Sequence, residues 1–546
     1  MHERARLHHD RRRRLGSLIN CHHDLEALLL LEDSAEAFSM DFLNLNYISK
    51  LLTSSLPLFS SWGNGENYER CMALKTNLTI ENTTILDVAY VRGGRTVKTQ
   101  GPCYSKASVS ASLCRVHFTT ETSPTSSIRA EAWLPDEWHG RFLGLGNGGL
   151  GGCISYRELD YGSAMHFATV GSNNGHDGNR GLPFLGNEEV LHDYVSRSIH
   201  TETLVGKQIV ETYYGRPHDK SYYIGCSSGG RQATYSALHY PEEFDGIVAG
   251  APATDFNHLL HWTGMLGRAL GAPDPQSFRR LVAAEILSQC DALDGVRDGV
   301  ITEPDSCDFR PEALICKNGD SGEKCLSLAQ VNALRKIYAP LYDQDELVMP
   351  RFDPGSEALY MDSVVFKGEI SPYPRDWLQY VVLNVTEFDF GQYGPVQGRL
   401  MEEANPYGIR TFDGDMSAFR DRGGKFLTYH GRIDPQIPSG NSKRMYDLVS
   451  RTLGMPSLDE FYRLFLVPGM GHCAGGPGAA DFGQLGVASN KLNASSHNVL
   501  LAIVDWVEAG VAPDNITGTA ADGSVRVHCR YPKKSVWDGE KYGCTE

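Results

Sequence analysis

The chain has 546 residues, of which 41% are hydrophobic and 22% are charged, as is usual for soluble globular proteins. Its formal net charge of −16 at pH 7 disfavours nucleic acid and anionic membrane surfaces as partners, because like charges repel. We therefore expect an acidic, folded protein that binds neither nucleic acid nor membranes.

The cysteine content and the glycosylation sequons indicate a compartment outside the cytosol. The chain contains 13 cysteines, which persist as disulfides mainly in oxidising compartments. Five sequons for N-glycosylation occur, at Asn77, Asn82, Asn384, Asn493 and Asn515. We expect a secreted, extracellular glycoprotein in which Cys21 is the odd cysteine.

The first 64 residues differ from the rest of the chain. They contain four consecutive arginines, two histidine pairs and a leucine run at 28–31 that Glu32 and Asp33 close. This apolar run is too short for a transmembrane helix, and no clear small-residue cleavage site follows it. We expect either a displaced start, with the true start near Met40, or a disordered extension, and prefer the former.

Period-2 alternation from about residue 65 to 134 predicts a β-rich entry, clearest at 84–90 and 127–134. Four cysteines in or just after this region could form two bridges in any of three connectivities: Cys71, Cys103, Cys114 and Cys153.

A glycine-rich run at 144–152 then follows a short apolar strand. The run could be a flexible loop. Its G-x-G-x-x-G frame also suggests a dinucleotide site, but we expect no helix after it that could present its N-terminus to a phosphate. A third interpretation is a loop whose backbone N–H groups hold an oxyanion, with Gly148 and Gly149 as the donors.

Strand-like and helix-like segments alternate from residue 166 to 252, which predicts βαβ units and a mostly parallel sheet. The alternation lapses over 256–410 and returns with strands at 425–431 and 461–467. We therefore predict an α/β-hydrolase catalytic domain made of residues 65–255 and 411–546. Residues 256–410 form an inserted domain that covers the sheet.

The segment 222–231 has the pattern of a nucleophile elbow. A β-branched and aromatic strand runs into Gly225-Cys226-Ser227-Ser228-Gly229, a G-x-S-x-G frame, and a helical pattern follows. The flanking glycines suit a serine on a strained turn, where side chains would collide with neighbouring backbone. Ser227 is the candidate nucleophile, and the amide of Ser228 is a candidate oxyanion donor.

A serine nucleophile needs a base and an acid that orients the base. Asp434 follows the strand 425–431, and His472 follows the strand 461–467, so the order Ser, Asp, His is that of an α/β-hydrolase. Asp434 alone could be a solvated turn residue and His472 a surface histidine, but their joint placement favours a triad. His430 is the competing base.

Cys226 and Cys473 each stand next to a proposed catalytic residue. If Ser227 and His472 meet, these two cysteines must also lie close together, and we expect them to be within reach of a disulfide. Two buried free thiols are the alternative.

The segment 291–301 contains three aspartates, Asp291, Asp294 and Asp298, with glycines between them. Carboxylate and carbonyl oxygens on a curling chain suit a hard cation such as calcium. The spacing is not that of an EF-hand, and a polar turn with solvated acids is the alternative.

Over roughly residues 71–544 the chain resembles the tannase and feruloyl esterase family of secreted, mainly fungal, esterases. It carries that family's Cys-Ser, Asp and His-Cys motif at Cys226-Ser227, Asp434 and His472-Cys473. Two short turns, at 172–177 and 214–218, look like the feruloyl esterase branch.

The resemblance implies an α/β-hydrolase core with an inserted lid, Ser227 as nucleophile, His472 as base and Asp434 as orienting acid. It implies a structural Ca²⁺ in the lid, held by the side chains of Asp291, Asp294 and Asp298 and the carbonyls of Val296 and Val300. It also implies six disulfides: Cys226–Cys473, Cys71–Cys114, Cys103–Cys153, Cys290–Cys307, Cys316–Cys325 and Cys529–Cys544. A secreted member should open with a signal peptide, and the start of this chain departs from that pattern.

We accordingly predict a secreted serine esterase, a monomer or homodimer without an organic cofactor. Its substrates are hydroxycinnamate (feruloyl-type) phenolic esters, either small or on a feruloylated plant polysaccharide. The alternatives are a tannase acting on galloyl esters, a peptidase on the same fold, and a calcium-binding extracellular protein with a non-catalytic hydrolase core.

Overall fold

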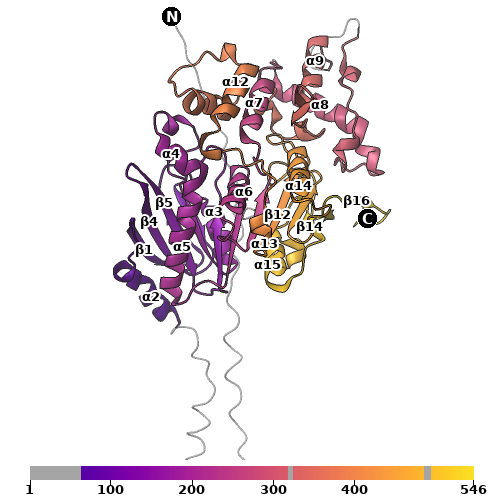
Figure 1. The fold of residues 1–546 in the computed structure, drawn as a ribbon. Helices are drawn as coiled ribbons and strands as arrows, with labels where there is room; N and C mark the ends of the chain where they lie inside the picture. The colour runs from indigo at the N-terminus through magenta and orange to yellow at the C-terminus, as the bar shows by residue number, and fades with distance from the viewer. Residues whose placement is uncertain (1–62, 273, 318–323, 485–493, 546) are drawn as a thin grey trace, which may run out of the picture. The chain divides into compact units, whose positions relative to one another are not determined.

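The computed structural model describes residues 63–272, 274–317, 324–484 and 494–545, which belong to one compact unit (Figure 1). The predictions for residues 1–62, including Cys21, and for the sequon at Asn493 lie outside these ranges. Within them, no helix has the length and apolar character needed to cross a membrane.

A nine-stranded sheet forms the centre of this unit (Figure 1). In spatial order its strands are β1 (Thr83–Val91), β4 (Leu113–Ser123), β5 (Ser126–Pro135), β7 (Phe167–Ser172), β6 (Arg141–Leu145), β8 (Lys220–Cys226), β9 (Gly246–Gly250), β12 (Lys425–Gly431) and β13 (Tyr462–Val467). The six strands from β7 to β13 run parallel, and β5, β4 and β1 extend the sheet in antiparallel fashion. The predicted α/β-hydrolase class is confirmed.

Helices cover both faces of the sheet, because residues along each central strand point alternately to two apolar clusters. Tyr223 of β8 packs into one cluster, and its neighbours Tyr222 and Ile224 pack into the other. The first cluster includes residues of α2 (Gly63–Asn77), α5 (Ser198–Tyr214), α6 (Ser228–His239), α13 (Ser417–Asp421) and α14 (Gly440–Leu453). The second includes residues of α3 (Tyr156–Ala164) and α15 (Val499–Ala509).

Two of these helices, α2 and α3, were not predicted from the sequence. The entry begins with helix α2 rather than with strands, and its buried positions Cys71 and Leu74, followed by Leu78, have helical spacing. Helix α3 does begin soon after the glycine run, although we expected none there. It is short and contains Gly162, and both features weaken a helical sequence pattern.

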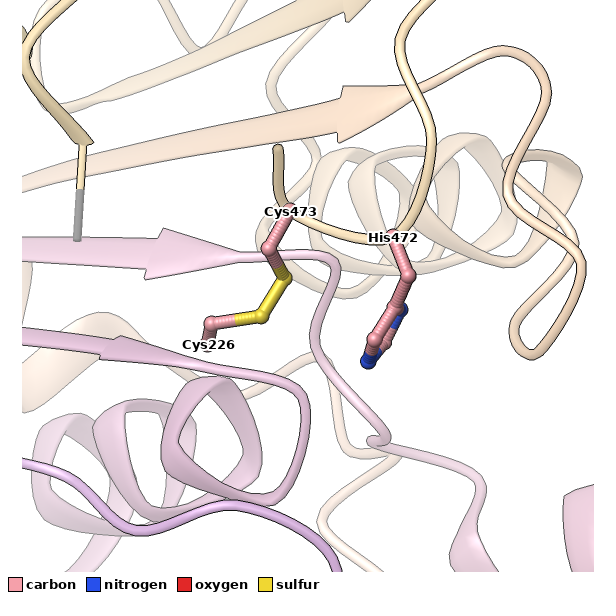
Figure 2. Close-up of side chains that lie close together, drawn as sticks. All are labelled: Cys226, His472 and Cys473. Atoms are coloured by element: carbon pink, nitrogen blue, oxygen red, sulfur yellow. A yellow bond between two sulfur atoms is a disulfide. The ribbon is translucent and has the colours of Figure 1, made fainter. Parts of the chain in front are cut away.

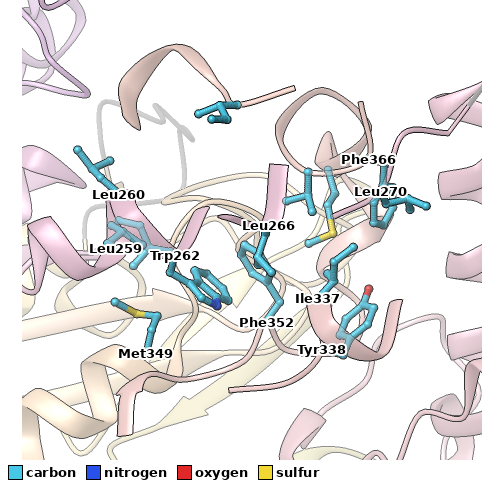
Figure 3. Close-up of a cluster of buried hydrophobic side chains, with 14 of the residues drawn as sticks. Leu259, Leu260, Trp262, Leu266, Leu270, Ile337, Tyr338, Met349, Phe352 and Phe366 are labelled. Atoms are coloured by element: carbon cyan, nitrogen blue, oxygen red, sulfur yellow. The ribbon is translucent and has the colours of Figure 1, made fainter. Parts of the chain in front are cut away.

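Residues 256–410 lie between β9 and β12, which are neighbours in the sheet. Trp262, Phe352 and Phe366 belong to a hydrophobic cluster in this inserted region, and the rings of Trp262 and Phe352 are 4.5 Å apart (Figure 3). The region contains α7 (Phe256–Gly267), α8 (Pro275–Cys290), α9 (Leu328–Ile337), β10 (Leu341–Asp343), β11 (Glu346–Met349), α10 (Met361–Val364), α11 (Pro372–Asp376) and α12 (Pro395–Ala404).

Short hairpins and the helical connection before α5 complete the α-helices and strands of the described residues. They are β2 (Arg95–Lys98) with β3 (Lys106–Val109), β14 (Asn515–Thr519) with β15 (Val525–Cys529), β16 (Ser535–Trp537) with β17 (Tyr542–Cys544), and α4 (Glu188–His192), which a π-helical turn at Asp193–Arg197 joins to α5.

All six disulfides implied by the family resemblance are present. They join Cys71 to Cys114, Cys103 to Cys153, Cys226 to Cys473, Cys290 to Cys307, Cys316 to Cys325, and Cys529 to Cys544.

Candidate active site

Ser227 lies on the sharp turn between strand β8 and helix α6. Its backbone has φ 63° and ψ −118°, a strained conformation for a residue with a side chain. The turn is closely packed: a Cβ atom on Gly225 would lie 2.7 Å from the carbonyl oxygen of Gly229. Ser228 opens α6, so its amide lies in the first helical turn, where no intrahelical acceptor exists.

The glycine loop after β6 lies against this turn. A Cβ atom on Gly229 would lie 3.0 Å from the carbonyl oxygen of Asn147. The carbonyl of Gly149 accepts hydrogen bonds from the Ser228 hydroxyl, at 2.6 Å, and from the Tyr194 hydroxyl, at 2.9 Å. Gly148 and Gly149 line the same cavity as Ser227, so the loop is fixed beside the candidate nucleophile.

A buried amide pair that sequence reasoning missed holds the loop to α6. The Asn147 backbone N–H donates to Gln232 Oε1 at 3.0 Å, and Gln232 Nε2 donates to Asn147 Oδ1 at 3.3 Å. Gln232 was available in the sequence as a polar residue one turn after the elbow, but its partner lies 85 residues away.

Asp434 lies in the loop after β12, is 1% exposed, and has both carboxylate oxygens engaged. Oδ1 accepts the backbone N–H groups of Gln436 and Ile437, at 2.8 and 3.0 Å, and Oδ2 lies 2.7 Å from His472 Nδ1. Burial alone would raise the pKa of Asp434, but the charges and hydrogen bonds of His472 and His430 outweigh it and hold the pKa below its ordinary value. The carboxylate is therefore ionised at neutral pH.

His430, the competing base, has no exposed surface. Its Nδ1 lies 2.7 Å from the Ser442 hydroxyl, and its Nε2 lies 3.0 Å from the carbonyl oxygen of Ile437 and 3.4 Å from Asp434 Oδ2. Both ring nitrogens have partners inside the protein, so His430 contacts Asp434 but is not available as a base for Ser227.

His472 follows β13 and lines the cavity that also contains Ser227. The disulfide between Cys226 and Cys473 lies beside the imidazole, joining the end of β8 to the histidine loop (Figure 2). Cys473 has φ 62°, a left-handed conformation that is unusual outside glycine. The covalent link therefore holds the loop of His472 against the turn of Ser227.

Removing this disulfide by the double substitution Cys226→Ala and Cys473→Ala should destabilise the fold by about 4 kcal/mol, because the bond closes a long loop. We also expect kcat/KM for a phenolic methyl ester to fall by about ten-fold or more, since misplacement of a catalytic group by about 1 Å costs up to about 10²-fold. Denaturant unfolding and steady-state assays measure the two effects.

The double substitution Cys316→Ala and Cys325→Ala is the matched control, since it removes a disulfide of the inserted region. It should leave kcat/KM within about two-fold. Equal loss of activity in both double variants would contradict the positioning role of Cys226–Cys473.

Ser227 stands where two cavities meet. One, of about 380 Å³, has polar and apolar walls in similar measure and is lined by His472 and the glycine loop. The other is apolar and extends under the inserted region, lined by Phe256, Leu259, Leu260, Ile437 and others. A serine at such a junction can face an ester whose apolar acyl group and polar alcohol occupy different cavities.

Tyr373 and Gln436 line both cavities. The Tyr373 hydroxyl accepts from Asn179 Nδ2 at 2.8 Å, and Gln436 Nε2 donates to the Tyr360 hydroxyl at 2.7 Å. Sequence reasoning assigned no site role to any of these four residues. Lining residues of this kind have no local sequence pattern, because distant loops supply them.

The three aspartates of the segment 291–301 lie on one curled turn, with Gly295 and Gly299 at positive φ. One oxygen of each carboxylate accepts a backbone N–H group: Gly299 for Asp291, Val296 for Asp294 and Val300 for Asp298. Burial, with the charges of Asp298 and Asp294, raises the pKa of Asp291. The residue types suit the calcium ion that the family resemblance implies, because a hard cation prefers carboxylate oxygens. The ligand atoms of the three carboxylates do not all lie within 4.8 Å of one another in this structure.

The four sequon asparagines within the described residues are exposed: Asn77, Asn82, Asn384 and Asn515.

A mostly parallel sheet with helices on both faces, a serine on the strained turn after a central strand, and an aspartate and a histidine after two later strands define an α/β-hydrolase. The family model described as "Tannase and feruloyl esterase" matches residues 114–364 and 360–544. The chain belongs to the tannase and feruloyl esterase family, which comprises carboxylic ester hydrolases.

Similar proteins agree with this assignment. The chain is 42% identical over 490 residues to a probable feruloyl esterase B of Aspergillus clavatus, covering 86% of this chain and 93% of that protein. Crystal structures of an esterase and of feruloyl esterase B, both from Aspergillus oryzae, match with TM-scores of 0.85 and 0.84 at 40% and 38% identity. Each match covers 88% of this chain and 100% of the other.

Proposed function

We propose that the protein is a secreted serine esterase that hydrolyses hydroxycinnamate esters through an acyl-enzyme. One observation carries the catalytic part: the buried carboxylate of Asp434 lies 2.7 Å from Nδ1 of His472, whose ring lines the cavity of Ser227. The relatives named as feruloyl esterases support the choice of acyl group. Secretion agrees with the six disulfides.

In this proposal Ser227 Oγ attacks the ester carbonyl carbon and its proton passes to His472 Nε2, because Nδ1 is held by Asp434. The amide of Ser228 and that of Gly148 or Gly149 donate to the oxyanion. His472 returns the proton to the departing alcohol, which leaves an acyl-Ser227. A water molecule then gives a proton to His472 and attacks the acyl carbon. As the acyl–oxygen bond breaks, His472 returns that proton to Ser227 Oγ and the free acid leaves. Residues 256–410 act as a lid that forms one wall of the acyl pocket.

A panel of phenolic methyl esters tests the substrate assignment. We expect kcat/KM for methyl ferulate to exceed that for methyl gallate by about ten-fold or more, because the apolar lining of the cavity disfavours the additional hydroxyl groups of the galloyl ring. The opposite order would identify a galloyl esterase, and amide cleavage without ester cleavage would identify a peptidase.

We further propose that the turn of Asp291, Asp294 and Asp298 binds Ca²⁺ together with the carbonyls of Val296 and Val300. The site lies next to the disulfide between Cys290 and Cys307, and the Tyr542 hydroxyl of β17 donates to Asp298 Oδ2 at 3.1 Å. The ion's contribution there is structural, because it neutralises three clustered carboxylates.

Chelation should therefore lower the melting temperature of the wild-type protein by about 3 °C or more, because an ion that binds only the folded state stabilises it. An Asp294→Asn variant should melt lower than wild type and no longer respond to the chelator. Asp308→Asn, which changes an exposed acid nearby, should respond as wild type does. An unchanged melting temperature in excess chelator would rule the site out.

A further inference from the structure

A second large cavity lies within the inserted region, between α7, α12 and the β10–β11 hairpin. Its volume is about 730 Å³, within the range of roughly 300–1,000 Å³ that is typical of ligand sites. We call it the α7–α12 cavity, and its lining includes Trp262, Met265, Leu341, Val348, Pro395 and Glu402. These side chains are mostly apolar and are separate from those that line the cavities at Ser227.

Helix α7 forms the wall between this cavity and the active site. Leu259, Leu260 and Thr263 line the apolar pocket at Ser227, whereas Trp262 and Met265 line the α7–α12 cavity. Residues three and four apart share a face of a helix, so the two sets mark two faces of one helix. Each cavity is therefore bounded by the same helix on a different face.

Two buried polar atoms in the lining of the α7–α12 cavity have no hydrogen-bond partner. His261 is 8% exposed, and its Nδ1 is buried without a partner. Burial and the charge of His258 lower the pKa of His261 to about 4, so this imidazole is neutral at neutral pH. An unpaired buried polar atom costs about 1–3 kcal/mol, a penalty that a bound polar group would remove.

Glu402 supplies the second atom. Its Oε2 lies 3.6 Å from His258 Nε2 and 3.8 Å from Arg410 Nε, whereas its Oε1 is buried without a partner. His258 and Arg410 in turn bind Asp255, both at 2.9 Å, so the carboxylate is anchored by one oxygen. The other oxygen is left as an acceptor.

We propose that the α7–α12 cavity binds a phenolic ring, which packs on the apolar side chains and donates its hydroxyl hydrogen to Glu402 with His261 as the second polar contact. Apolar walls with a few polar groups are typical of sites for aromatic ligands. The exposed rim carries two basic residues, Lys336 and Arg399, and two acidic ones, Asp343 and Glu403. The rim therefore favours neither a cationic nor an anionic ligand. The ring and its hydroxyl therefore define the ligand class.

If the proposed function holds, this site would let one polysaccharide bind at two places. A polysaccharide that carries several feruloyl groups can place one in the α7–α12 cavity and another at Ser227. Binding of the first raises the effective concentration of the second.

Calorimetric titration of the full chain with 4-hydroxycinnamate, and separately with cinnamate, tests the proposal. We expect a binding component that is lost in Ala339→Trp, since the new side chain fills the cavity, and in Met265→Trp, which fills it from α7. Ala329→Trp, at an exposed position of α9, is the matched control and should keep the component. In wild type, cinnamate should bind this component about ten-fold more weakly, because it lacks the hydroxyl.

Only variants whose melting temperatures match are compared. If Ala339→Trp does not fold, Met265→Trp replaces it. Identical isotherms for the filled-cavity variants and the Ala329→Trp control would overturn the site, and equal affinity for the two acids would overturn the role of the hydroxyl. Competitive inhibition of ester hydrolysis reports on the pocket at Ser227 instead. Failure of the proposed function would remove that inhibition and leave the binding component in place.

Discussion

The Ser227→Ala variant should lose about 10⁴-fold or more in kcat/KM for methyl ferulate, because no other group supplies the bond to the acyl carbon. Residual turnover above the uncatalysed rate would come from the oxyanion donors and from binding. Substrate affinity and melting temperature should stay close to wild type, since the removed hydroxyl is small and lies at the cavity surface. Steady-state kinetics and equilibrium binding measure these quantities.

Ser155→Ala is the matched control, because it removes a hydroxyl group from the wall of the same cavity. Its kcat/KM should stay within about five-fold of wild type. Similar activity in the two variants would contradict the assignment of Ser227.

The second large effect is expected for Asp434→Asn, which should lower kcat/KM by about 10³- to 10⁴-fold. Asparagine can still accept the backbone N–H groups of Gln436 and Ile437 through its oxygen, so the loop should keep its shape. Its NH₂ group then faces His472 Nδ1, which favours the tautomer that carries the proton on Nε2. That tautomer cannot take the proton of Ser227.

Loss of the negative charge also removes the stabilisation of the imidazolium that forms during the reaction. The effect should therefore be on kcat, with KM little changed. An Asp434→Asn enzyme with kcat within ten-fold of wild type would exclude this carboxylate as the orienting acid.

The sequence predicted most of the central sheet, because the parallel strands are short, largely apolar or aromatic segments such as Gly246–Gly250 and Tyr462–Val467. It also predicted candidate residues at strand ends, since Ser227 directly follows a recognisable strand and Asp434 and His472 lie in the loops after two others. The carboxyl ends of parallel strands meet at one edge of a sheet, so chain order was enough to group these three residues.

Sequence reasoning failed where the pattern was weak or the partners were remote. Helix α2 has a polar first half, and only Cys71 and Leu74 show the helical spacing of its buried face. The contacts of Asn179 with Tyr373 and of Gln436 with Tyr360 join segments 194 and 76 residues apart. No local periodicity marks such pairs, because three-dimensional packing alone brings them together.

In the proposed mechanism Ser227 forms the covalent intermediate. The most direct test is mass spectrometry of the peptide that contains Ser227 after reaction with a serine-directed aryl phosphonate. We expect stoichiometric phosphonylation of Ser227 that parallels the loss of esterase activity and is absent from the Ser227→Ala protein. Inactivation with the label on another residue, or with no label on this peptide, would contradict the account.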